Sequence, residues 1–180
     1  MYIIRKTEHG DLDAVMDIYD KARITMGVLG IDQWQNGYPA REDVEGDILH
    51  GEGYVLVFEN KIVGAFMLTK TPEEAYEKID GAWLNDEPYA AVHRIAVSPE
   101  HRATFSGPIR NISASTFIMD YAKKFAVDNG LAGGIRIDTH KDNVPMRRML
   151  EKNGFRHCGK ITLVGGVEDG KPREAYQYCE

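Results

Sequence analysis

The chain is poor in cysteine and has no long apolar run. Its 180 residues include only Cys158 and Cys179, which stand far apart and show no CxxC spacing. Such a pair forms neither a disulfide framework nor a zinc knuckle, so we expect no metal. No stretch approaches the roughly 18 apolar residues of a membrane helix, and residues 1–6 lack the apolar core of a signal peptide. We expect a soluble protein in a reducing, cytoplasmic setting.

Positive charge is not in excess. The sequence has 22 Lys and Arg against 28 Asp and Glu, a net charge of −6. An acidic domain is a poor general binder of nucleic acid or anionic membranes, but it can hold a local basic pocket for a phosphate and can attract a cationic substrate. Hydrophobic residues make up 43%, which excludes a disordered chain and predicts one globular domain over residues 1–180.

The periodicity predicts alternating helices and strands. Asp11 is a candidate N-cap for the first helix, Asn60 and Lys61 form a two-residue hairpin turn, and a short helix starts at Thr71. The predicted strands cover 2–6, 54–59, 62–69, 90–97, 135–138, 155–163 and 173–178, and the longer helices cover about 12–26, 41–49, 113–128 and 143–153. This order predicts one mixed α/β (α+β) domain.

The most informative unit runs from residue 90 to residue 155. A strand ends near Pro99, and a helix with small residues at its start, Ser113 and Ser115, follows a loop that contains Arg110. Small residues at a helix N-terminus let backbone N–H groups approach a phosphate. The alternative is that Ser113 or Ser115 is only an N-cap.

Three motifs in this order resemble those of the GNAT superfamily of acetyl-CoA-dependent N-acetyltransferases. They are the hairpin Asn60-Lys61-Ile62-Val63-Gly64-Ala65, the strand end Ile95-Ala96-Val97-Ser98-Pro99, and the helix that opens at Asn143 and closes at Asn153-Gly154-Phe155. The resemblance implies a mixed, mostly antiparallel sheet that splays between the strand at 90–97 and the strand at 135–138 and is flanked by helices. It also implies transfer of an acetyl group from acetyl-CoA to a primary amine of a small molecule or peptide, by direct attack in a ternary complex. The alternative is a non-catalytic acyl-CoA-binding or regulatory module.

The resemblance also implies contacts to acetyl-CoA. These are Ile95, Ala96 and Val97 for the pantetheine arm, Arg110, Asn111, Ile112, Ser113, Ala114 and Ser115 for the pyrophosphate, and Asn143 where the strands splay. Two departures from the family pattern stand out. The phosphate loop lacks its glycines, and either Arg102 or Arg110 could lead it, of which we prefer Arg110. Leu150 occupies the position where the family often has the tyrosine that protonates the leaving thiolate.

Acetyl transfer requires a base that makes the amine neutral. His93, two residues before Ile95, is the first candidate for that base, and His140 is the second. An imidazole with an ordinary pKa of about 6.5 suits this role. The alternatives are a packing role for His93 and a loop-capping role for His140.

The acceptor side is expected to come from the first helices and the loop between them. Trp34 and Tyr38 are candidates for a pocket wall, and Asp32 for pairing with a cationic amine. The alternative is that Trp34 only anchors the loop. Residues 70–90 are expected to add a lid or a dimer contact, and edge strands near the C-terminus are compatible with a homodimer.

Overall fold

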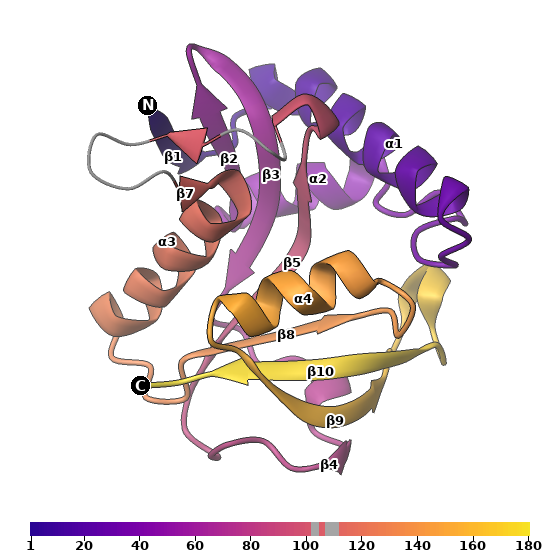
Figure 1. Cartoon of the computed structure of the whole chain (residues 1–180), viewed down its shortest axis with the longest axis vertical. Coiled ribbons are helices and arrows are strands. Elements are labelled where there is room, and N and C mark those ends of the chain that lie inside the picture. The colour runs from indigo at the N-terminus through magenta and orange to yellow at the C-terminus, as the bar shows by residue number, and fades with distance from the viewer. Residues whose placement is uncertain (102–104, 107–111) are drawn as a thin grey trace.

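The computed structural model describes residues 1–101, 105–106 and 112–180, and one eight-stranded sheet runs through it (Figure 1). The strand order is β1-β2-β3-β5-β8-β10-β9-β4, and every neighbouring pair is antiparallel except β5 and β8. The predicted mixed, mostly antiparallel sheet is therefore confirmed. Its strands are β1 (Tyr2–Lys6), β2 (Gly53–Phe58), β3 (Lys61–Thr69), β4 (Ile79–Gly81), β5 (Ala90–Val97), β8 (Ile135–Thr139), β9 (Arg156–Thr162) and β10 (Pro172–Tyr178). A separate two-stranded sheet joins β6 (Phe105–Ser106) to β7 (Ile112–Ser113).

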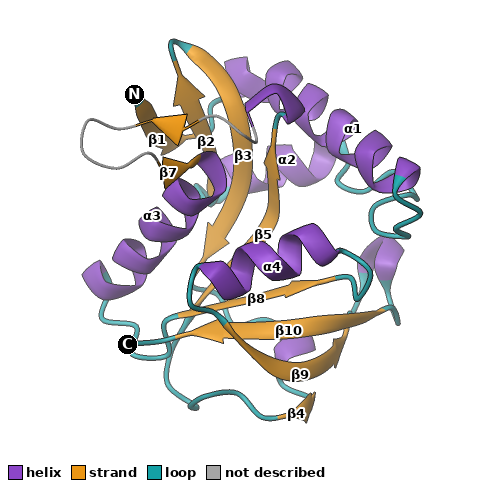
Figure 2. Ribbon diagram, in the orientation of Figure 1, coloured by secondary structure: helices purple, strands orange, loops and turns teal. Residues whose placement is uncertain are grey.

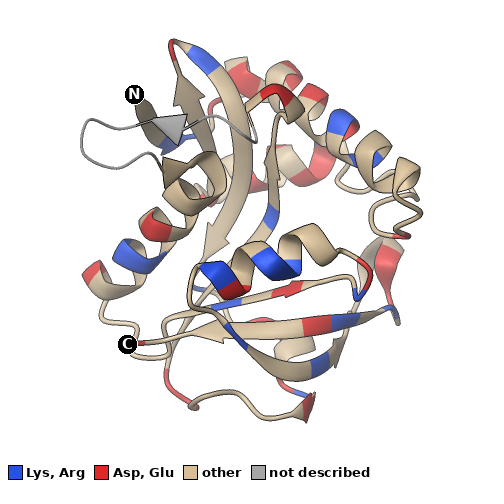
Figure 3. Cartoon of the chain, in the orientation of Figure 1, with Lys and Arg blue, Asp and Glu red and all other residues tan. Residues whose placement is uncertain are grey.

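Helices cover both faces of the sheet, as Figure 2 shows. The helices α1 (Leu12–Val28) and α2 (Arg41–Leu49) bury a core on one face with Val55, Ala65 and Ala96. The helices α3 (Ala114–Asp128) and α4 (Val144–Lys152) bury a larger core on the other face. Acidic and basic residues both occur on α1, α3 and α4 (Figure 3). Within the described residues, no helix is long and apolar enough to cross a bilayer.

Two of the predicted helix starts, at Ser113 and Asn143, have the expected capping bonds, whereas Asp11 does not cap its helix. The side chains of Ser113 and Asn143 accept hydrogen bonds from the backbone N–H groups of Thr116 and Met146, as N-caps do. Asp11 also precedes its helix, but its carboxylate makes no cap bond to α1. It accepts instead from the Glu8 backbone N–H at 2.8 Å and from both terminal nitrogens of Arg5.

The sheet opens at its centre. The parallel pairing of β5 with β8 includes only Ala90 opposite Ile135 and Ala91 opposite Arg136, after which the two strands diverge. This agrees with the predicted splay between residues 90–97 and 135–138. Among the described residues, the part of β5 after Ala91 therefore has no strand paired to it on the β8 side.

A β-bulge lies in β5 next to this opening. Met67 of β3 pairs with His93 and Ala65 pairs with Ala96, so β5 has one extra residue between these pairs. Arg94 has a φ of 53°, a value unusual for a residue with a side chain. The bulge breaks the regular alternation of side chains just where the strands diverge.

Residues 70–90 differ from the prediction. The short helix expected from Thr71 is a 3-10 turn at Glu74–Tyr76, and the backbone N–H of Thr71 donates to the Thr69 hydroxyl instead. The unpredicted strand β4 pairs with β9 through Gly81 and Gly159, where a Cβ atom on Gly81 would lie 2.2 Å from the Cys158 carbonyl oxygen. The β2–β3 turn is also one residue earlier than predicted, at Glu59 and Asn60, which both have positive φ.

Candidate active site

A cleft of about 620 Å³ lies at the point where β5 and β8 diverge. Its walls come from the end of α1, the loop after α1, residues 92–97 of β5, the end of β8, the start of α4 and residues 163–168. Several sequence-predicted residues meet there, although they are distant in the chain. They are Trp34, Tyr38, His93, Ile95, Ala96, Val97, Ser115 and Asn143.

His93 lies beside two carboxylates in the cleft. Its Nε2 atom is 3.0 Å from Oε1 of Glu73, and the His93 side chain is only 18% exposed. Nε2 is buried and has no hydrogen bond of good geometry among the described residues, so this contact is an ion-pair contact. Burial opposes ionisation of Glu73, but the close contact with His93, helped by the charge of Arg94, outweighs burial and holds the pKa of Glu73 below its usual value.

The second carboxylate is Asp138, at the end of β8. The Tyr76 hydroxyl donates to Asp138 Oδ1 at 2.8 Å. Burial raises the pKa of Asp138, and the nearby charge of His93 opposes that rise. Asp138 therefore adds a second carboxyl group to the part of the cleft lining that contains His93.

Arg94, next to the bulge, is held by a buried ion pair. Its Nε atom donates to Oδ2 of Asp47 at 3.0 Å, and its Nη2 atom donates to Oδ1, which makes the pair bidentate. Its Nη1 atom donates to the Tyr38 hydroxyl at 2.6 Å. The side chains of Arg94 and Asp47 are 12% and 8% exposed, so the guanidinium is compensated within the protein.

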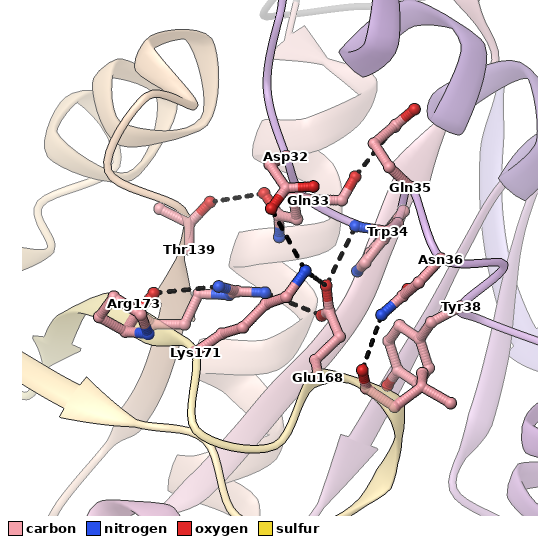
Figure 4. Close-up of polar contacts among 12 residues, drawn as sticks. Asp32, Gln33, Trp34, Gln35, Asn36, Tyr38, Thr139, Glu168, Lys171 and Arg173 are labelled. Atoms are coloured by element: carbon pink, nitrogen blue, oxygen red, sulfur yellow. Dashed lines mark hydrogen bonds and ion pairs between the residues drawn. The ribbon is translucent and has the colours of Figure 1, made fainter.

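Residues 163–173 hold the loop that contains Trp34 (Figure 4). The buried Glu168 accepts from the Trp34 backbone N–H at 3.2 Å and pairs with Arg173 Nη2 at 2.8 Å. The Asn36 side chain donates to the Val167 carbonyl at 2.8 Å. Trp34 is itself buried and packs edge-on against Tyr19 and Tyr38, so it both anchors the loop and lines the cleft.

Asn143 connects this loop to α4. Its Oδ1 atom caps the helix, while its Nδ2 atom donates to the Gln33 side chain at 2.9 Å. The Thr139 hydroxyl also reaches Gln33, at 3.4 Å. Asn143 is therefore fixed at the mouth of the cleft, where the strands diverge.

Asp32 and His140 lie outside the cleft lining, as do Ile112, Ser113 and Ala114 of the expected phosphate loop. Asp32 is ion-paired to Lys171 at 3.3 Å, as Figure 4 shows, and its side chain is 72% exposed. His140 accepts from the Asp142 backbone N–H through Nδ1 at 3.2 Å, which is the loop-capping alternative. We assign neither Asp32 nor His140 a role in the reaction.

The predicted phosphate loop is described only in part. Arg110 and Asn111, and the rival Arg102, lie outside the described residues. Ile112 and Ser113 form β7, Ala114 is fully buried at the start of α3, and Ser115 reaches the cleft. The Ser113 hydroxyl accepts from the Thr116 N–H, so its N-cap role is confirmed.

Leu150 is fully buried in the core. The α4 residues that line the cleft are instead Pro145, Met146 and Met149. The position at which the family often has its tyrosine is therefore occupied by an apolar core residue.

Sequence reasoning missed Glu73, Asp138 and Arg94. Glu73 was assigned to a helix start, and the turn that replaces this helix brings its carboxylate to His93. Asp138 is the last residue of a predicted strand and lies two residues before His140. This position at a strand end could have indicated a site residue. Arg94 follows His93, but its place in the cleft depends on a bulge that pairing with β3 creates.

Solved structures with the same architecture are numerous. A GNAT-family acetyltransferase from Streptococcus agalactiae is 30% identical, with 99% of this chain and 95% of that chain covered and a TM-score of 0.81. A GNAT-family acetyltransferase from Listeria monocytogenes is 24% identical, with 99% of this chain and 95% of that chain covered and a TM-score of 0.67. A putative streptothricin acetyltransferase from Bacillus anthracis, solved in complex with acetyl coenzyme A, is 22% identical, with 71% of this chain and 61% of that chain covered and a TM-score of 0.50.

The sequence matches no protein-family model and no curated protein. The likeness to the Streptococcus agalactiae structure nevertheless extends over almost the whole of both chains, at an identity that goes beyond a shared fold. The chain belongs to the GNAT family of acetyltransferases.

Proposed function

We propose that this protein transfers an acetyl group from acetyl-CoA to a primary amine, with direct attack in a ternary complex. The observation that carries the proposal is the divergence of β5 and β8 beside His93. Residues 92–96 have β3 on one side and line the cleft on the other. The acetyl-CoA complex of the Bacillus anthracis neighbour supports this choice of co-substrate.

The described residues fit such a co-substrate. An extended pantetheine arm can pair with the main chain of Ile95, Ala96 and Val97, as an added strand does. Asn143 lies at the end of that gap, and Ser115 faces it from the start of α3. The role of Arg110 and Asn111 at the pyrophosphate remains part of the proposal.

His93 is the base in this account. Acetyl-CoA supplies the acetyl group as an activated thioester. The acceptor ammonium gives a proton to the His93 imidazole, and the neutral nitrogen then bonds to the carbonyl carbon as the carbon–sulfur bond breaks. Overall, an ammonium ion and a thioester give an amide, a free thiol and one proton released to solvent. Glu73 orients the imidazole and attracts the ammonium, since it is ionised beside both.

Calorimetry with acetyl-CoA, combined with thiol release over a broad amine panel, tests the proposal. We expect acetyl-CoA binding together with amine-dependent thiol release and a matching acetylated product. Binding without amine-dependent release by any amine would favour the non-catalytic acyl-CoA-binding module instead.

A further inference from the structure

The charges of the cleft are unevenly compensated. Among the residues that the structure describes, its lining contains two arginines and no lysine. Arg94 is bound on three nitrogens by Asp47 and Tyr38, and Arg173 is 1% exposed and paired with Glu168. Both guanidinium groups are therefore already paired within the protein, and neither is available to compensate a negative charge on a ligand.

Two acidic residues of the same lining, Glu73 and Glu74, have no such partner within the described part of the chain, in contrast to Glu168, which is paired with Arg173. Glu73 faces His93, which must be neutral to act as a base, and the more distant charge of Arg94 is already paired with Asp47. Glu74, the next residue, is exposed and also lines the cleft. A carboxylate or phosphate on the acceptor would meet these two carboxylates with no unpaired cation among the described lining residues, whereas an ammonium ion would be attracted.

The rim of the cleft carries exposed apolar side chains. Leu29, Val164 and Val167 are 57%, 52% and 63% exposed, and all three line the cleft. The bond from Asn36 to the Val167 carbonyl and the contact of Glu168 with Trp34 hold residues 164–167 against the loop after α1 (Figure 4). Apolar groups fixed at the mouth of a cleft are suited to covering an apolar part of a ligand.

We infer that the acceptor is a primary amine on an apolar body, such as an arylalkylamine, with no carboxylate or phosphate. Its ammonium group faces Glu73 and His93, and its apolar body lies against Leu29, Val164 and Val167. This inference rests on the proposed acetyl transfer and narrows its substrate class.

The test compares phenethylamine, phenylalanine and phenylalaninamide as acceptors with saturating acetyl-CoA. Phenylalanine adds a charged carboxylate to phenethylamine, and the amide keeps its bulk without its charge. We expect kcat/KM for phenethylamine to exceed that for phenylalanine by about 10²-fold, with the amide close to phenethylamine. Calorimetric binding of the three compounds without acetyl-CoA should follow the same order.

The variant Glu74→Lys adds a cation to the exposed wall, and Glu74→Gln removes the charge only. We expect Glu74→Lys to raise the phenylalanine to phenethylamine ratio of kcat/KM by about 10-fold over wild type, and more than Glu74→Gln does. Acetylation of phenylalanine as fast as that of phenethylamine would overturn the inference while acetyl transfer stands. Failure of all three compounds and of the broad amine panel would overturn the proposed function, and the inference with it.

Discussion

His93 and Glu73 meet in the cleft through a contact of 3.0 Å between Nε2 and Oε1, although they belong to a central strand and to the loop that leaves β3. The loop after β3 therefore completes the candidate catalytic site instead of simply connecting two strands.

Replacement of His93 by alanine removes the proposed base. We expect kcat to fall by about 10²-fold or more, with acetyl-CoA affinity preserved, because the imidazole acts on the amine. Steady-state kinetics over a range of pH measures this. His140→Ala is the matched control and should lose far less activity, since His140 caps a loop outside the cleft. An unchanged pH–rate profile in His93→Ala would remove His93 from the role.

Glu73→Gln keeps the shape of the side chain and removes its charge. We expect kcat/KM for a cationic amine to fall by about 5-fold, chiefly through KM, as for loss of one partly exposed charge interaction. Glu73→Asp should recover part of the loss. Glu77→Gln, at an exposed position outside the cleft lining, provides the control. Equal losses in Glu73→Gln and Glu77→Gln would contradict a role for Glu73 at the amine.

Asp47→Asn leaves the buried guanidinium of Arg94 without its charge partner. We expect the free energy of unfolding to fall by about 3–5 kcal/mol, since an uncompensated buried charge is costly. Denaturant titration measures this loss. Asp128→Asn breaks the exposed pair with Lys124 and should cost less than about 1 kcal/mol. Similar losses in the two variants would show that Arg94 is solvated or re-paired in Asp47→Asn.

Asp11 links stability to pH. Its hydrogen bond with Arg5 is the largest cause of a pKa below the usual aspartate value, and burial opposes it. A lowered carboxyl pKa stabilises the fold above the unfolded-state pKa of about 3.9, and this stabilisation is lost as the pH falls through the folded-state value. Because the pair with Arg5 is partly exposed and screened by solvent, Asp11→Asn should cost less than about 1 kcal/mol at pH 7, and its difference from wild type should shrink below about pH 4. A difference that stays constant down to pH 2 would contradict this.

Leu150→Ala tests the apolar role assigned to this position. Leu150 is fully buried, so we expect a loss of about 2–5 kcal/mol in the free energy of unfolding. Val127 is an exposed residue on α3, so the control variant Val127→Ala should change the free energy of unfolding little. A small loss in Leu150→Ala, with a large change in kcat, would instead show that the residue acts at the leaving thiolate.

Local patterns predicted the elements well because they depend on nearby residues. The N-caps Ser113 and Asn143 bond to backbone groups three residues away, so the sequence marks both helix starts. The stripe of buried residues on α1 follows its helical spacing for the same reason. The opening between β5 and β8 was predicted from the resemblance to the family, since no local pattern in the sequence indicates it.

The composition of the site depends on contacts between distant segments. Arg94 enters the cleft because β3 pairs with β5 one residue out of register, and its partner Asp47 lies on α2. Glu168 reaches Trp34 across most of the chain length. No spacing rule links such residues, so only the folded chain identifies them.

Direct acetyl transfer from acetyl-CoA to an amine requires both substrates to be bound at once, which an initial-rate grid that varies both substrates distinguishes from transfer through an acetylated protein. With the best amine of the panel, we predict intersecting double-reciprocal lines, an acetylated amine as the product and no acetylated protein. Parallel lines with an acetylated protein, or thiol release that no amine increases, would contradict direct transfer.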